Sequence, residues 1–101
     1  MKLYRVSTSL WVRSKDFTSN TNEIEVKDGK TYSGDGHRIS KDKIMRIDTN
    51  HYENSGSIHY FTWCFEEQLE EARLMLKNHI IKKVKQYKED IDALYEIVIS
   101  N

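Results

Sequence analysis

One short segment concentrates side chains that could bind an anion. Residues 37–46 read His-Arg-Ile-Ser-Lys-Asp-Lys-Ile-Met-Arg and hold four cations. Arg38 suits bidentate contacts with phosphate or carboxylate, and Lys41 adds a second charge. Trp11 and Tyr32 are candidate stacking faces of the kind that single-strand binders use. The segment therefore predicts a nucleic-acid or nucleotide site or, because aspartates interleave with the cations, a solvated strand and turn.

The sequence contains no recognisable motif for catalysis or metal binding. A metal site needs several converging ligands, and a nucleophile needs a base within reach. Gly34-Asp35-Gly36 lacks the later glycine, the lysine and the helix of a phosphate-binding loop. Ligand-type spacing is absent from the four histidines, which are His37, His51, His59 and His79. We therefore expect no enzyme activity, no metal and no cofactor, with Cys64 as a buried, inert thiol.

Charge and composition limit the functional classes to which the protein can belong. The 101-residue chain carries 16 basic and 16 acidic side chains, so it has no global attraction to nucleic acid or anionic membranes. It has no apolar run near the ~18 residues of a membrane span, and its first residues lack the apolar stretch of a signal peptide. A single cysteine fits a reducing compartment. We expect one small cytoplasmic domain over residues 1–101, with no membrane partner.

The elements that must position these side chains are strands followed by a helix. Residues 3–13 alternate between two sets of side chains, as a half-buried strand does. Further strands are expected around Ile24 and Val26, at 30–33, around Ile39, Ile44 and Ile47, and at 57–64. Turns are expected at Asp28-Gly29 and Gly34-Asp35-Gly36, and polar connections at 14–22 and 50–56. The expected class is α+β, with a small antiparallel sheet of four to five strands in residues 1–64 and one long C-terminal helix in 65–99.

The C-terminal helix is long for so small a domain. Apolar residues recur at steps of three or four, at Leu69, Ala72, Leu76, Ile80, Val84, Tyr87, Ile91, Leu94 and Val98. A helix from about Glu66 to Val98 spans on the order of 50 Å. A second apolar stripe flanks the first, at Leu74, Ile81, Tyr95 and Ile99. Together the stripes cover roughly 200°, whereas a one-sided surface helix shows about 100°.

This wide apolar arc predicts a second contact for the helix. A curved sheet that wraps the helix, a homodimer that uses Leu74, Ile81, Tyr95 and Ile99, and a different partner protein are the three interpretations. Helix charges fall into an acidic block at 66–71, a basic block at 73–88 and an acidic block at 89–96. An in-register pair sets the lysines against one another, which favours a staggered antiparallel pair.

A partner-binding surface is expected on the first strand. Leu10 and the residues in phase with it are expected to face the core. Trp11 alternates onto the opposite face of the strand, so its side chain is expected to point away from the core. Arg5 and Arg13 share the face of Trp11, and aromatic residues and arginines dominate interface energetics. Further candidate contacts are Arg38, Lys41 and Arg46. The alternative is that Trp11 packs beneath the helix.

Three stretches, taken in order, carry a resemblance. They are Lys-Leu-Tyr-Arg-Val at 2–6, Lys-Thr-Tyr with Gly-His-Arg-Ile-Ser-Lys in 30–41, and Tyr60-Phe61-Thr62-Trp63 ahead of Glu-Glu-Ala-Arg at 70–73 and the long helix. This layout resembles small early proteins of bacteriophages and prophages. Those with a known role often bind a host protein or a defence component, as anti-CRISPR proteins do, or sequester a nucleotide signal.

The resemblance implies a non-enzymatic accessory protein that binds and blocks a host protein, such as a CRISPR-Cas component, in the host cytoplasm. It carries over no functional residue, because it contains no catalytic or ligand motif. Two alternatives stay open. One is a nucleic-acid or nucleotide binder that uses residues 37–46, and the other is a self-assembling structural module.

Overall fold

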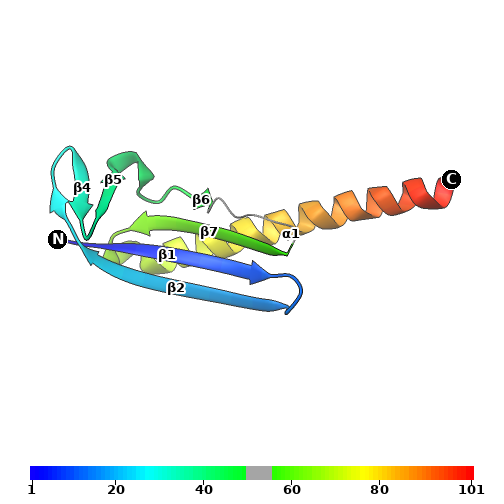
Figure 1. Ribbon diagram of the computed structural model, residues 1–101, viewed down its shortest axis with the longest axis horizontal. Coiled ribbons are helices and arrows are strands. Elements are labelled where there is room, and N and C mark those ends of the chain that lie inside the picture. Colours follow the sequence, from blue (N-terminus) through cyan, green and yellow to red (C-terminus); the bar gives the residue numbers. More distant parts are fainter. Residues whose placement is uncertain (50–55) are drawn as a thin grey trace.

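Two antiparallel sheets and one long helix make up the protein. The computed structural model describes residues 1–49 and 56–101, so the expected connection at 50–56, with His51, lies outside the described residues except for Gly56. The strands are β1 (Lys2–Trp11), β2 (Asp16–Glu25), β3 (Lys27–Asp28), β4 (Thr31–Gly34), β5 (His37–Ser40), β6 (Asp48–Thr49) and β7 (Ser57–Cys64). Short 3-10 turns η1 (Lys41–Lys43) and η2 (Glu66–Gln68) precede β6 and α1 (Leu69–Ser100), respectively (Figure 1).

The strands divide between a four-stranded sheet, in the order β2-β1-β7-β6, and a three-stranded sheet, in the order β3-β4-β5. The pairings of these strands are antiparallel. The α+β class with a long C-terminal helix is therefore confirmed. Both expected glycine turns are also present, since β3 pairs with β4 and β4 pairs with β5 across them.

The β1–β2 hairpin is the main departure from expectation. Residues 14–22, expected as a connection, instead supply most of β2, which pairs with β1 from Lys2↔Glu25 to Trp11↔Asp16. A tight turn joins the strands, with Lys15 in the left-handed region at φ 59°. The expectation is wrong because β2 is an edge strand with nearly all side chains exposed, so its order comes from backbone pairing and no apolar face marks it.

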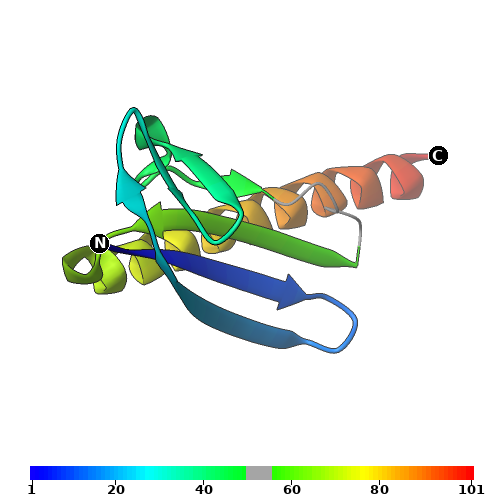
Figure 2. The same cartoon turned by 60° about the vertical axis from the view of Figure 1, so that its left-hand side comes forward.

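Strand β1 contributes to two cores, one on each face of the larger sheet. Between the sheet and α1 lie Val6, Ile58, Tyr60, Cys64, Ala72, Leu76 and Ile80. Between the same sheet and the smaller sheet lie Leu3, Val26, Tyr32, Ile39 and Trp63. Figure 2 shows the β4–β5 region on one side of the larger sheet and α1 on the other. Both faces of β1 are therefore covered, one by α1 and the other by the smaller sheet, instead of one face being exposed to solvent.

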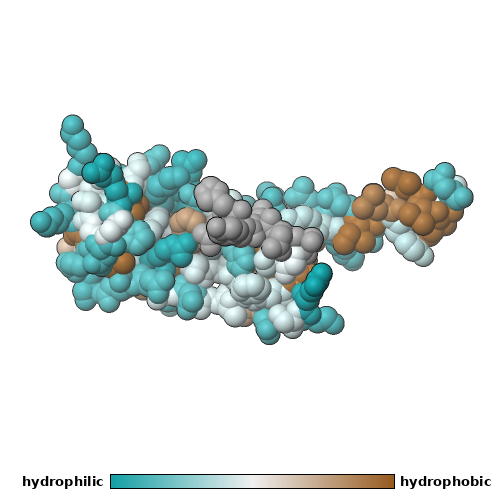
Figure 3. Space-filling model, viewed as in Figure 1, coloured by the Kyte–Doolittle hydropathy of each residue, from teal (hydrophilic) through white to brown (hydrophobic). Residues whose placement is uncertain are grey.

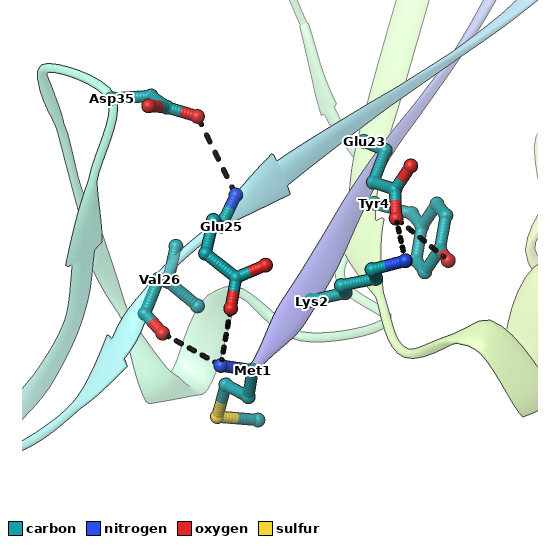
Figure 4. A network of polar contacts seen from close by, with 7 residues as sticks. All are labelled: Met1, Lys2, Tyr4, Glu23, Glu25, Val26 and Asp35. Carbon is teal, nitrogen blue, oxygen red and sulfur yellow. Dashed lines mark hydrogen bonds and ion pairs between the residues drawn. The ribbon is translucent and has the colours of Figure 1, made fainter.

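Gly34 allows the smaller sheet to fold back across the corner of the larger one. A Cβ at this position would collide with the carbonyl oxygen of Glu25 and lie 3.0 Å from the Cα of Val26. Figure 4 shows the hydrogen bonds of this corner, where the Met1 amino group donates to Glu25 Oε1 at 2.9 Å and to the Val26 carbonyl at 3.1 Å. The Glu25 N–H donates to Asp35 Oδ2 at 3.4 Å. The Asp35 contact joins the β4–β5 turn to the end of β2, and the Met1 contacts join the start of the chain to the same corner.

Only the first turns of α1 lie on the sheet. Ala72, Leu76 and Ile80 are its buried residues, and the His79 ring meets the Tyr60 ring edge-on at 4.5 Å. Beyond Ile80 the helix leaves the sheet, giving the molecule dimensions of 60 × 22 × 20 Å (Figure 1). The sheet therefore does not wrap the whole helix. Within the described residues, no helix is long and apolar enough to cross a membrane.

Candidate binding sites

A groove between the two sheets gathers charged and aromatic side chains. This inter-sheet groove has a volume of about 400 Å³ and is lined by Arg5, His37, Arg38, Ile39, Ser40, Lys43, Asp48, Phe61 and Trp63. β1, β7 and β6 of the larger sheet supply one side, and β5 with η1 supplies the other. The lining residues come together because β1 pairs with β7 and the β4–β5 hairpin folds over both.

Two ring contacts order the aromatic part of the inter-sheet groove. The Cζ atom of Arg5 lies 4.1 Å from the centroid of the Phe61 ring, within cation–π range. The His37 and Trp63 rings meet edge-on with centroids 5.5 Å apart. Partial burial lowers the pKa of the Arg5 guanidinium from a value so high that the group stays charged at neutral pH. The groove thus holds a positioned cation against an aromatic surface.

Positive charge exceeds negative charge in the inter-sheet groove. Arg5, Arg38 and Lys43 line it together with one carboxylate, that of Asp48. Lys43 Nζ lies 3.1 Å from Asp48 Oδ2, and this hydrogen bond, assisted by the charge of Arg46, lowers the pKa of Asp48. Arg38 is exposed and forms no ion pair with any other described residue. It is the groove cation most open to an external anion.

Lys41, Arg46 and Tyr32 occupy other positions. Lys41 Nζ lies 2.6 Å from Asp28 Oδ1 and 5.2 Å from the Tyr32 ring centroid, and the hydrogen bond to Asp28 raises the pKa of Lys41. Arg46 pairs with Asp42 at 3.6 Å. The stacking face expected from Tyr32 is not available, because its side chain is only 8% exposed and belongs to the core between the sheets.

Trp11 lies at the other end of β1 from Arg5, roughly 20 Å away at ~3.3 Å per residue. Its side chain is 43% exposed, and its ring meets the His59 ring edge-on at 4.8 Å. Arg13 follows in the exposed β1–β2 turn. The structure therefore brings Arg5 and Arg38 to one groove and places Trp11 and Arg13 elsewhere, so the expected patch around Trp11 is divided between two regions.

Two apolar grooves flank α1 where it leaves the sheet, and we call them the distal grooves. One, of about 440 Å³, is lined by Leu10, Trp11, Val12, Lys15, Ile58, Val84, Tyr87, Lys88 and Ile91. The other, of about 460 Å³, is lined by Leu10, Phe17, Lys77, Ile80, Ile81, Val84 and Lys85. Val84 borders both, and the lining is aliphatic and aromatic apart from lysines. Such a surface suits an apolar partner.

The remaining length of α1, residues 81–100, is a bare amphipathic segment that we call the distal helix. Its apolar side chains are between 42% and 74% exposed, at Ile81, Val84, Tyr87, Ile91, Leu94, Tyr95, Ile97, Val98 and Ile99. Figure 3 shows hydrophobic surface over the C-terminal turns of the helix, with hydrophilic residues on the part nearer the sheet in this view. Both stripes read from the sequence are therefore uncovered here. Leu74, from the second stripe, is 59% exposed but stands on the half of α1 that lies over the sheet.

Cys64 is buried in the fold, and His59 is partly buried. Burial raises the pKa of the Cys64 thiol, which lies in the core beneath α1. His59 Nδ1 lies 2.8 Å from Ser9 Oγ, in a contact that crosses from β7 to β1. Over residues 1–49 and 56–101, no cluster of three or more histidine, cysteine, aspartate or glutamate side chains is placed to hold a metal ion.

Sequence reasoning missed the aromatic part of the inter-sheet groove. The alternation within 57–64 places Phe61 and Trp63 on one face, but only the pairing Arg5↔Trp63 and Ser7↔Phe61 shows that Arg5 lies there too. The chain matches no protein-family model, no curated protein and no solved structure. Its function is therefore inferred from the chemistry and geometry of its own residues.

Proposed function

We propose that this protein acts by binding, as a homodimer whose two copies join through the distal helix. The observation that carries the proposal is that α1 has no buried residue beyond Ile80, although its apolar residues continue to Ile99. Each Å² of apolar surface removed from water contributes about 25 cal/mol. A second copy presents an identical uncovered helix, so pairing covers both at once.

The charges of the distal helix favour an antiparallel pair. A basic block at Lys82, Lys83, Lys85 and Lys88 precedes an acidic block at Glu89, Asp90, Asp92 and Glu96. A parallel pair sets the two basic blocks side by side, whereas an antiparallel pair centred near Ile91 separates them and places each opposite residues 94–100 of the other copy, which include Glu96 and no basic side chain. Each exposed ion pair contributes ~0–1 kcal/mol, so charge selects the orientation and apolar burial supplies the affinity.

This arrangement differs from the stagger expected from the sequence. That stagger uses the acidic block at 66–71, which lies in η2 and the first turn of α1, on the half of the helix that the sheet covers. Only residues beyond Ile80 are free to pair along their apolar stripe. The expected stagger sets 66–71 against residues near 83–88 and so is centred near residue 77, whereas the proposed pair is centred near Ile91, in the bare half of the helix.

The same pairing gives the distal grooves an occupant. Val84 and Val98 are each seven residues from Ile91, since 91 − 84 = 7 and 98 − 91 = 7. In a pair centred near Ile91, Val98 of one copy therefore lies beside Val84 of the other. Because Val84 borders both distal grooves, the last helical turn of the second copy extends towards Trp11 and Phe17. An apolar helix in an apolar groove is a recurring mode of protein recognition.

Sedimentation equilibrium tests the dimer directly. The wild-type chain is expected to sediment at twice its mass of 12.0 kDa in the micromolar range. The double variant Ile91→Glu/Leu94→Glu should be a folded monomer, because it places four carboxylates in the proposed interface. Leu74→Glu is the matched control, since Leu74 is equally exposed but lies outside the distal helix. A 12.0 kDa wild-type species at high micromolar concentration contradicts the proposal.

The proposed target of this dimer is a host protein, and a component of CRISPR-Cas defence is the first to test. The proposal is supported by the resemblance to early phage proteins and by the uncovered apolar surface, which suits a blocking protein that works inside the host cell. The test counts phage plaques on an immune bacterial strain that expresses the wild-type protein, the Ile91→Glu/Leu94→Glu variant or neither. Restored plaques with the wild type support this target, and unchanged immunity contradicts it without bearing on the dimer.

A further inference from the structure

We propose that the inter-sheet groove binds the phosphate group of a small nucleotide, with Arg38 and Lys43 as the anion contacts and Arg5 as the surface for the base. The proposal does not depend on the dimer, because the groove lies between the two sheets and the distal helix begins beyond Ile80.

Local charge is the first argument. The whole chain has zero net charge, but the described residues that line the inter-sheet groove include three basic side chains and one carboxylate. Asp48 is engaged by Lys43 at 3.1 Å, whereas Arg38 makes no ion pair with a described residue. An exposed arginine in such a setting can form two parallel hydrogen bonds to a phosphate. The excess charge is thus concentrated where a small anion can reach it.

The position of Arg5 is the second argument, because it adds a planar surface to the charged one. Its guanidinium lies over the Phe61 ring at 4.1 Å and is half-buried, so its plane is held in place rather than free in solvent. Guanidinium planes stack on nucleic-acid bases as aromatic rings do. The exposed His37 ring, which meets the buried Trp63 ring edge-on, adds further aromatic surface beside it. The chemistry therefore fits a ligand that joins a phosphate to a flat heteroaromatic ring.

Size is the third argument. Small-molecule sites have volumes of about 300–1,000 Å³. At about 400 Å³ the inter-sheet groove lies at the small end of this range. It suits a mononucleotide better than an oligonucleotide, which needs an extended basic track along its backbone. The absence of net positive charge on the chain also disfavours long nucleic acids, whose binding depends on many phosphate contacts.

Isothermal titration calorimetry at low salt provides the test. The probes are adenosine and guanosine 5′-monophosphates, the two free nucleosides, inorganic phosphate and a single-stranded oligodeoxythymidylate. At least one monophosphate should bind more tightly than either its nucleoside or inorganic phosphate, because only the nucleotide uses both halves of the site.

Three single variants connect binding to the inter-sheet groove. Arg38→Ala should weaken binding of the monophosphate about tenfold, the loss expected for one charge-assisted contact. Arg13→Ala, at an exposed arginine in the β1–β2 turn, is the matched control and should change nothing. Asp48→Asn should strengthen binding, since it releases Lys43 and removes the only carboxylate among the described residues that line the groove.

Circular dichroism on each variant confirms that it is folded before its titration is interpreted. The proposal is overturned if no monophosphate binds, if inorganic phosphate binds as well as the nucleotide, or if the oligonucleotide binds and the mononucleotides do not. It is also overturned if a folded Arg38→Ala variant binds the monophosphate as the wild type does.

Discussion

Leu76 and Leu94 lie on the same face of α1, eighteen residues and about five helical turns apart, in opposite environments. The side chain of Leu76 is fully buried against the larger sheet, and that of Leu94 is 60% exposed. The first half of this continuous apolar stripe is thus buried in the core, and the second half is exposed apolar surface. This contrast between equivalent residues makes them a natural pair for mutation.

Leu76→Ala should lower the free energy of unfolding by about 2–5 kcal/mol, because it removes a fully buried side chain and leaves a cavity. Leu94→Ala should leave the unfolding of the monomer nearly unchanged and weaken the proposed dimer. Urea titrations at two protein concentrations separate the effects, since only the Leu94 variant should lose the concentration dependence of the midpoint. Equal losses at both positions would show that Leu94 is packed within its own chain.

Cysteine cross-linking should report the orientation of the helices. Mixing Val84→Cys chains with Val98→Cys chains should give an oxidised heterodimer, because an antiparallel pair centred near Ile91 brings these positions together. Each variant alone should cross-link poorly. Cys64 does not interfere, since its thiol is buried and its pKa is raised by that burial. Efficient cross-linking of Val84→Cys with itself would indicate a parallel pair.

Trp11→Ala should have little effect on thermal stability. The Trp11 side chain is 43% exposed and its ring contact with His59 is an edge contact, so the expected loss is about 1 kcal/mol. A Trp11 packed beneath the helix would instead cost ~3–5 kcal/mol. A melting curve at a concentration where the protein is monomeric decides between the two. A large fall in the melting temperature would exclude a partner-binding role for Trp11.

Gly34→Ala should destabilise the corner that holds the β4–β5 hairpin. Its new methyl group would meet backbone atoms of Glu25 and Val26, which cannot move aside as a flexible side chain can. The expected cost is about 1–3 kcal/mol, together with weaker nucleotide binding if the inter-sheet groove is displaced. Gly29→Ala is the control, because a Cβ there would meet only the Thr31 carbonyl oxygen at an ordinary 3.6 Å. Chemical denaturation of both variants gives the comparison.

Asp48→Asn should destabilise the protein near neutral pH but not in acid. Its hydrogen bond from Lys43 lowers the pKa of Asp48 from 3.8, so the carboxylate stabilises the fold above the ordinary pKa. That contribution is lost as pH falls through the lowered value, because the group is then protonated in both states. The free energies of unfolding from urea titrations at pH 7 should differ by ~0–1 kcal/mol for this half-exposed pair and converge well below pH 3.8. A difference that grows in acid would contradict this assignment.

Local patterns in the sequence determined most of the elements. The three-and-four spacing from Leu69 to Val98 predicts α1, and the β-branched and aromatic residues at 57–64 predict β7 within its observed bounds. Asp28-Gly29 and Gly34-Asp35-Gly36 predict the two turns of the smaller sheet. These local predictions hold in the folded structure because helical and strand periodicity depend on neighbouring residues, and turn preferences depend on single backbone positions.

Tertiary structure alone decided where those elements lie and what they leave uncovered. β2 has no apolar face, so only its pairing with β1 makes it a strand. The sequence of β1 indicates one covered face, that of Val6 and Leu10, and the fold over Gly34 places the smaller sheet on the other face as well. Arg5 meets Phe61 and Arg38 through pairings that join distant segments, and such long-range contacts leave no local pattern. The width of the apolar stripe predicted a second contact for α1, but its location followed only from the length of the sheet, which ends its cover at Ile80.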